Sequence, residues 1–295
     1  MNDRGIDISA HCKAPGLPVV LLAFGLALGA LTASDGFLSV SEAAEDLFSP
    51  AWVARWQRAL AEGHPWAVLL EDNAKKSATP AQRYGDTGMY AALMSRIKGD
   101  TRYPGESCIP NSTTYTYAEK SWCVIKGLIA SVPGDRNITR EYTTSTAINY
   151  LALKPWLDQN PTIKAEFINK MNAWADANLV RTRLGDSDET TGQGLGNMAW
   201  AVVSAADNPR ASYYLNHPII GGLTPTGANF ANSRNAINLY VTDLARGGVW
   251  IESGEYNMGT LRLLFMGSEL VSTVTGVDHF PEVTQFASSA ALGQV

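Results

Sequence analysis

The chain has 295 residues, of which 45% are apolar and 17% are charged, a composition that excludes disordered, collagen-like and disulfide-dense small proteins. Its 23 Lys and Arg against 28 Asp and Glu give a net charge of −5, whereas a general nucleic-acid binder carries a basic excess. We therefore expect a folded, mildly acidic protein of one large domain or two small ones, with no nucleic-acid partner.

The first 33 residues have the layout of a secretory signal peptide. Arg4 and Lys13 precede an apolar stretch, Leu17–Leu31, which ends in small residues near Ala33. The alternative is an uncleaved membrane anchor, but the stretch is interrupted by proline and glycine and is short of the ~20 apolar residues that a spanning helix needs. We expect a secreted or periplasmic protein without stable membrane insertion, whose folded domain is residues 34–295.

Export changes the interpretation of the cysteines. Cys12 would leave with the leader, while Cys108 and Cys123 remain, an even count for an oxidising compartment. We expect a disulfide between them; the alternative is a pair of buried thiols. The histidines are scattered without metal-ligand spacing, so no metal site is expected.

Helical patterns follow one another along the mature chain, and no runs of period-two apolar residues separate them. Glycine, proline and asparagine punctuate the segments. The expected helices are Ala51–Leu70, Pro80–Ile97, Tyr117–Ala130, Glu141–Leu157, Thr162–Val180, Thr190–Ala206, Asn229–Ala245, Gly254–Val274 and Pro281–Leu292. The sequence therefore predicts an all-α protein of successive helical hairpins.

Two long loops, Arg102–Thr116 and His217–Ala228, interrupt the helices, and we expect them to be too polar to be buried. Loops of this length in a compact domain are often functional. Helical hairpins with long loops at one end favour an (α/α) toroid, here an incomplete barrel or one truncated at its C-terminus. The alternative is an α-solenoid, which would repeat at a fixed period that this chain lacks.

The glycine cluster Gly192–Asn197 has the spacing of a dinucleotide loop, but it follows a polar stretch and not a strand. Walker A, GxSxG and HExxH motifs are also missing from the sequence, and we expect no cofactor. Glycines that open a helix instead allow another backbone or a ligand to come close.

The most informative segment is Gly247–Leu261, which reads GGVWIESGEYNMGTL. It resembles the "DG…E(G/S)…Y" segment of toroidal polysaccharide lyases, the heparinase II/III-like and alginate-lyase-like families. In those families a loop enters an inner helix whose Tyr is the catalytic acid and often also the base, and an upstream Asn is usually followed by His. The resemblance assigns these roles to Tyr256 and Asn197. Met198 replaces the His, so the task of the base falls to Tyr256 or to His217.

The resemblance implies β-elimination on an acidic, uronic-acid-containing polysaccharide. Elimination removes the proton on C5, next to the carboxylate, and the carboxylate charge must be neutralised. An amide such as Asn197, or an Arg, can do this, and an Arg near Tyr256 favours the phenolate that takes the proton. Arg246 is the preferred Arg. The candidates for holding the glycan are Trp200, Arg234, Trp250, Glu252, Glu255 and Asn257.

Other interpretations stay open. Tyr256 and Asn197 can be packing residues at a helix start and between helices, and His217 an ordinary surface side chain. A second function class is a glycoside hydrolase on an α/α toroid, which needs two opposed carboxylates. Glu252 with Glu255, or members of the group Asp186, Asp188 and Glu189, would supply them. A third is a catalytically inactive glycan-binding domain.

Overall fold

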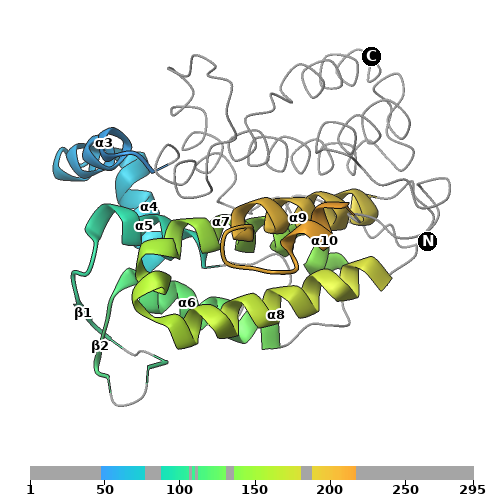
Figure 1. Ribbon diagram of the computed structural model, residues 1–295. Helices are drawn as coiled ribbons and strands as arrows, with labels where there is room; N and C mark the ends of the chain where they lie inside the picture. The colour runs from blue at the N-terminus through green and yellow to red at the C-terminus, as the bar shows by residue number, and fades with distance from the viewer. Residues whose placement is uncertain are drawn as a thin grey trace, which may run out of the picture. The chain divides into compact units, whose positions relative to one another are not determined.

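The computed structural model describes residues 48–76, 88–105, 108–109, 112–130, 136–180 and 188–216. Most of these residues are helical, which confirms the all-α class (Figure 1). The helices are α3 Pro50–Ala61, α4 Pro65–Lys76, α5 Met89–Lys98, α6 Tyr117–Ala130, α7 Arg136–Gln159, α8 Pro161–Val180, α9 Asp188–Ser204 and α10 Ala211–Asn216. Two short strands, β1 Tyr103–Pro104 and β2 Thr114–Tyr115, pair antiparallel.

The predicted helices between residues 117 and 206 agree with the structure to within a few residues at each end, and α6 has the predicted bounds. The prediction of one helix over Ala51–Leu70 was wrong. The chain breaks after α3 because Gly63 takes a left-handed conformation, with φ of 68°, and Pro65 then begins α4. The predicted Pro80–Ile97 helix was wrong at Gly88, which takes a left-handed conformation with φ of 80°, so that α5 begins at Met89. Residues 80–87 lie outside the described residues. The helices predicted beyond residue 228, like the signal peptide, lie outside the described residues.

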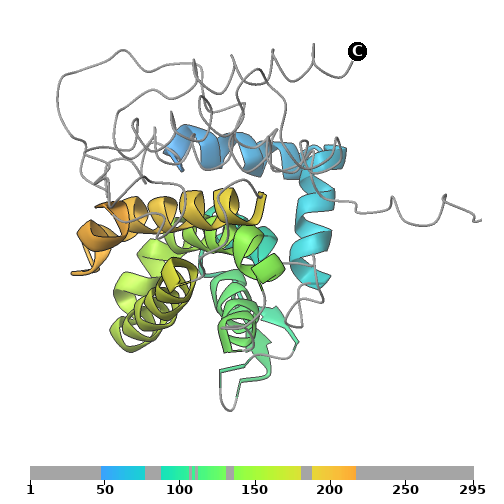
Figure 2. The ribbon, with the colours of Figure 1, turned by 90° about the vertical axis from the view of Figure 1, so that its right-hand side faces the viewer.

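The described helices form two layers that alternate along the chain. α5, α7 and α9 pack side by side, with α7 in the middle. α4, α6 and α8 each directly precede one of these helices in sequence. α4 and α8 have several exposed side chains, whereas Lys126 is the exposed one among those described for α6. In both views, α6 and α8 lie below the α7–α9 pair (Figures 1 and 2). From Tyr142 to Leu153 in α7, and from Gly192 to Ser204 in α9, every side chain is buried.

Four large aromatic side chains, one from each of α6, α7, α8 and α9, form the centre of this packing. The ring centroids of Trp122 and Phe167 lie 5.7 Å apart, those of Phe167 and Tyr150 5.3 Å, and those of Tyr150 and Trp200 5.1 Å. Each of the four is essentially inaccessible to solvent. Aromatic pairs in such geometries contribute stability beyond the area that they bury, so this cluster joins both layers.

A glycine sets the closest approach of α7 and α9. A Cβ placed on Gly196 would lie 2.6 Å from the Cβ atom of Thr143 and 3.3 Å from the backbone nitrogen of Thr144. Side chains cannot come so close, so the two backbones pack at a distance that only glycine permits. This confirms that the glycine cluster serves the approach of another backbone. Gly192–Asn197 lies within α9 and follows no described strand.

None of the helices that the structure describes is long and apolar enough to cross a membrane.

Candidate functional site

The structure describes two of the predicted site residues, Asn197 and Trp200, and places them one turn apart on α9. Both are fully buried. The remaining predicted site residues lie outside the described residues: Tyr256, His217, Arg246, Arg234, Trp250, Glu252, Glu255 and Asn257. The same holds for the loop His217–Ala228 and the segment Gly247–Leu261.

Asn197 lies on the side of α9 that faces α8. Its Nδ2 donates a hydrogen bond to the carbonyl oxygen of Ala175, at 3.1 Å. Its Oδ1 accepts one from Nδ2 of Asn178, at 3.0 Å, and that amide also donates to the hydroxyl of Thr143, at 3.2 Å. Both ends of the Asn197 amide are therefore engaged in a contact that joins α7, α8 and α9.

Trp200 belongs to a second buried polar group, centred on Asn172 of α8. The indole Nε1 donates to Oδ1 of Asn172, at 3.0 Å. The amides of Asn172 and Asn208 exchange two hydrogen bonds, of 3.1 and 2.9 Å, and Asn208 also donates to the hydroxyl of Ser204. We call Asn172, Trp200, Ser204 and Asn208 the Asn172 network. The network joins the turn after α9 to α8, and the indole N–H of Trp200 is used in a hydrogen bond within it.

A partly buried ionic cluster lies where α7 ends, α8 begins and the turn after α9 passes. Asp207 accepts hydrogen bonds from Lys154, at 3.0 Å, from the hydroxyl of Tyr150, at 2.7 Å, and from Lys164. Burial raises the pKa of Asp207, but the bonds from Lys164, Tyr150 and Lys154 outweigh burial and leave the pKa below its ordinary value. Each carboxylate oxygen has a cationic partner, so the cluster joins three elements and serves packing.

The polar face of α7 is a different feature. Tyr142, Ser145, Thr146 and Asn149 follow the i, i+3, i+4, i+7 spacing of one helical stripe, and all four are buried. The hydroxyl of Thr146 has no hydrogen-bond partner within the described part of the chain. Buried hydroxyls are normally paired, so Thr146 keeps hydrogen-bonding capacity in the interior of the inner layer.

The loop Arg102–Thr116 contains the other organised polar site, which sequence reasoning treated only as a long polar loop. It forms the β1–β2 hairpin, and Tyr115 and Thr116 at its end are buried. The expectation that the loop is too polar to be buried was therefore wrong at these two positions. Thr116 and Glu119 form a capping box at the start of α6: Glu119 accepts from the Thr116 backbone nitrogen at 2.9 Å, and Thr116 Oγ1 accepts from the Glu119 backbone nitrogen at 3.2 Å.

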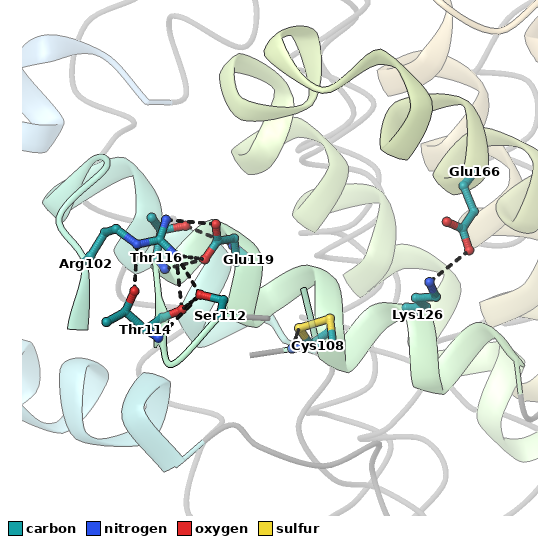
Figure 3. The surroundings of a disulfide bond; sticks show 9 residues. Arg102, Cys108, Ser112, Thr114, Thr116, Glu119, Lys126 and Glu166 are labelled. Atoms are coloured by element: carbon teal, nitrogen blue, oxygen red, sulfur yellow. Dashed lines mark hydrogen bonds and ion pairs between the residues drawn. A yellow bond between two sulfur atoms is a disulfide. The ribbon is translucent and has the colours of Figure 1, made fainter. Parts of the chain in front are cut away.

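Arg102 joins the hairpin to this cap (Figure 3). Its guanidinium donates to both carboxylate oxygens of Glu119, each at 3.0 Å. It also donates to the hydroxyl and the carbonyl of Thr114, at 2.9 and 3.1 Å, and to the hydroxyl of Ser112, at 3.2 Å. The predicted disulfide is confirmed: Cys108 in the loop is bonded to Cys123 of α6. The hairpin is thus fixed to α6 at two separate points.

Sequence reasoning also missed the tyrosines and lysines around this hairpin. Tyr103, Tyr115 and Tyr117 form a ring cluster, with the Tyr103 and Tyr117 centroids 4.9 Å apart. Glu71 of α4 lies beside them, with its Oε1 3.5 Å from the hydroxyl of Tyr117. A readable signal was the run Thr114–Tyr117, which alternates Thr and Tyr where the capping box begins.

Within the ranges that the structure describes, no group of three or more His, Cys, Asp and Glu side chains is arranged to hold a metal ion. The polar groups described above are amides, hydroxyls, carboxylates, and ammonium and guanidinium groups. Their chemistry suits packing in the interior and polar or ionic recognition at the surface.

Comparison with known proteins finds no matching protein family, no similar characterised protein and no similar solved structure.

Proposed function

We propose that the chain is a polysaccharide lyase that cleaves an acidic, uronic-acid-containing glycan by β-elimination on an incomplete (α/α) toroid. The observation that carries this proposal is the alternation of layers along the chain. Each helical hairpin, α4–α5, α6–α7 and α8–α9, contributes its second helix to the inner layer. Successive hairpins with one helix inside and one outside are the building units of a toroid.

The character of the inner layer supports the same proposal. Most of the described side chains of α7 and α9 are buried, as are half of those of α5, which fits the inner ring of a toroid. The polar stripe of α7 keeps an unpaired hydroxyl at Thr146 among the described residues. A glycan site needs polar groups on inner helices, and the Thr146 hydroxyl is one that could serve a ligand.

The chemistry comes from the segment Gly247–Leu261 and its resemblance to toroidal lyases. The proton on C5 of the uronate passes to the Tyr256 phenolate, the electron pair forms the C4–C5 double bond, and the C4–O bond to the leaving sugar breaks. Tyr256 then returns its proton to the leaving oxygen. A cation near Tyr256 lowers its pKa from near 10 toward the working pH, and Arg246 is our candidate.

Neutralisation of the substrate carboxylate is the role proposed for Asn197 or for an Arg. Asn197 can perform it only if its amide gives up its bonds to Asn178 and Ala175. Arg234 and Arg246 are the alternatives in the sequence. We favour an Arg, because breaking two buried hydrogen bonds would reduce the stabilisation that the amide offers to the carboxylate.

We also propose that the protein is exported. The disulfide between Cys108 and Cys123 supports export, because such bonds persist in oxidising compartments and are rare in the cytosol. The signal-like first 33 residues point the same way.

The test is an absorbance assay on alginate, glucuronan and a heparin-like chain, since elimination creates a conjugated double bond that absorbs in the ultraviolet. We expect the wild-type protein to raise the absorbance on at least one polymer and Tyr256→Phe to lose nearly all of this activity while folding normally. Tyr213→Phe, a tyrosine exposed on α10, is the matched control and should keep full activity. Substantial activity in Tyr256→Phe would assign the proton transfer to another residue, with His217 the first candidate.

One observation favours a second function, glycoside hydrolysis. α9 begins at Asp188, so Asp188 and Glu189 lie in the first turn of an inner helix. Toroidal hydrolases need paired carboxylates across the cleft. New reducing ends without ultraviolet absorbance would select this function and reject the lyase.

A further inference from the structure

Glu71 of α4 is surrounded by cationic side chains. Nζ of Lys98 on α5 lies 3.4 Å from its Oε1, and Nζ of Lys75 lies 3.6 Å from the same oxygen. The side chains of Lys75 and Lys98 are 46% and 31% exposed, whereas that of Glu71 is 18% exposed. Because two accessible ammonium groups share one recessed carboxylate, positive charge remains available to an anion from solution.

Aromatic rings lie beside the same carboxylate, since the hydroxyl of Tyr117 is 3.5 Å from Glu71 Oε1. Tyr103 of β1 is half-buried, and its ring lies 4.9 Å from that of Tyr117 and 6.0 Å from that of Tyr115. Nζ of Lys120 stands 4.5 Å from the centre of the Tyr115 ring, and it also donates to the backbone carbonyl of Lys75. Four elements, α4, α5, α6 and the hairpin, therefore meet in one surface of cations and tyrosine rings. We call Glu71, Lys75, Lys98, Tyr103 and Lys120 the Glu71 patch.

The tyrosine hydroxyls stay protonated at neutral pH. Burial, and then the negative charge of Glu71, raise the pKa of Tyr103 above its ordinary value. Burial is also the largest cause of the raised pKa of Tyr115, followed by Tyr103 and Glu71. A neutral phenol keeps its hydrogen-bond donor and does not repel an anion.

The patch is held in place before any ligand arrives. Arg102 and the Cys108–Cys123 disulfide fix the hairpin to α6 on either side of Tyr103 in sequence. A rigid arrangement loses little conformational entropy on binding, which favours affinity. Sugars present apolar C–H faces that pack on aromatic rings, and uronic acids add a carboxylate to that face.

We propose that the Glu71 patch binds one uronic-acid unit of an acidic polysaccharide, with the sugar face on Tyr103 and its carboxylate between Lys75 and Lys98. The proposal takes its class of ligand from the proposed function, but it does not depend on elimination chemistry. It adds a binding site contributed by the N-terminal half of the chain, away in sequence from the segment that contains Tyr256.

The chain offers a matched control for the charge of this patch. Around Glu166 of α8, Nζ of Lys126 and Nζ of Lys170 lie 3.7 and 3.8 Å from Oε1. Their side chains are 50% and 28% exposed, close to the values for Lys75 and Lys98. Glu71 also lies 3.5 Å from the hydroxyl of Tyr117, whereas the interactions of Glu166 within the described part of the chain are those with its two lysines. Exposed ion pairs contribute little to stability, so neither pair of substitutions should unfold the protein.

The experiment measures binding of alginate and glucuronan by affinity gel electrophoresis, in the full-length mature protein carrying Tyr256→Phe so that cleavage is prevented. We expect Lys75→Gln with Lys98→Gln to weaken binding about tenfold, the value for losing about 1.4 kcal/mol of charge-assisted contacts. Lys126→Gln with Lys170→Gln, which removes the same charge, should change it less than about twofold. Tyr103→Leu should also weaken binding, because leucine keeps the bulk but removes the ring.

Equal loss in both lysine pairs would overturn the proposal and assign binding to overall charge. The proposal would also be overturned if the protein bound neither alginate nor glucuronan, or if it bound dextran sulfate more tightly than both of them. The ultraviolet assay on the wild-type protein separates this proposal from the proposed function. If the wild-type protein raises the absorbance but the Lys75 and Lys98 substitutions do not weaken binding, the lyase is retained and the patch is rejected. Weakened binding without any absorbance retains the patch and rejects the lyase.

Discussion

The Asn172 network and the β1–β2 hairpin both consist of dense polar contacts, but they differ in burial. The Asn172 side chain makes three hydrogen bonds to Trp200 and Asn208, which are 0% and 3% exposed. The Arg102 guanidinium makes five, yet its side chain is 45% exposed. Water can replace lost partners only at the hairpin. The number of bonds therefore says less about stability than their access to solvent.

The largest effect is expected where no water can enter. Asn172→Ala leaves the indole N–H of Trp200 without its partner in the interior and removes two hydrogen bonds of the Asn208 amide, which keeps Ser204 as an acceptor. Unsatisfied buried groups cost about 1 to 3 kcal/mol each, so we expect the free energy of unfolding to fall by about 3 kcal/mol or more. Urea unfolding measures this loss.

Gln57→Ala is the control for Asn172→Ala. Its Nε2 donates to the carbonyl of Ile97 at 2.8 Å, but the side chain is exposed. We expect a loss below about 1 kcal/mol, because water replaces the amide. Equal losses in the two variants would show that burial does not separate the two kinds of contact.

A smaller effect is expected at Asn197, whose removal leaves Asn178 with its second acceptor, the hydroxyl of Thr143. We expect Asn197→Ala to lower the free energy of unfolding by about 1 to 2 kcal/mol. Elimination activity per folded molecule should be unchanged if an Arg neutralises the carboxylate. A loss of turnover of about 10²-fold with little loss of stability would instead return that role to Asn197.

The sequence predicted the helical spans best where proline or glycine marks their ends. Asn160-Pro161 separates α7 from α8, and both helices were expected there. Gly63 and Pro65 carry the same signal, but the apolar pattern of Ala51–Leu70 outweighed it and a single helix was predicted. The hairpin strands have two residues each, too few to show a period of two.

The polar networks could not be predicted, because their partners are far apart in the sequence. Asn172 and Asn208 are separated by 36 positions, and Arg102 and Glu119 by 17. The disulfide could be predicted from the sequence because removal of the signal-like leader leaves only Cys108 and Cys123. The asparagine at position 172 gave a partial signal, since asparagine is a poor helix former and this one lies among apolar residues of α8. Its partners required the fold.

The smallest effect is expected at Arg102, where the comparison is most direct. Arg102→Lys keeps the positive charge but removes the planar fork that reaches Glu119, Thr114 and Ser112 together. The disulfide still holds the hairpin to α6, and water can satisfy the exposed acceptors. We therefore expect a loss of less than about 1 kcal/mol in the free energy of unfolding, in spite of the five bonds removed.

The same variant has an expected dependence on salt. Because Arg102 is exposed in its pair with Glu119, the difference in unfolding free energy between Arg102→Lys and the wild type should shrink as the salt concentration rises from about 0.01 to about 0.5 M, since salt screens the charges. Urea unfolding at both salt concentrations provides the measurement. A loss that matches Asn172→Ala and does not change with salt would mean that the hairpin, too, behaves as part of the protein interior.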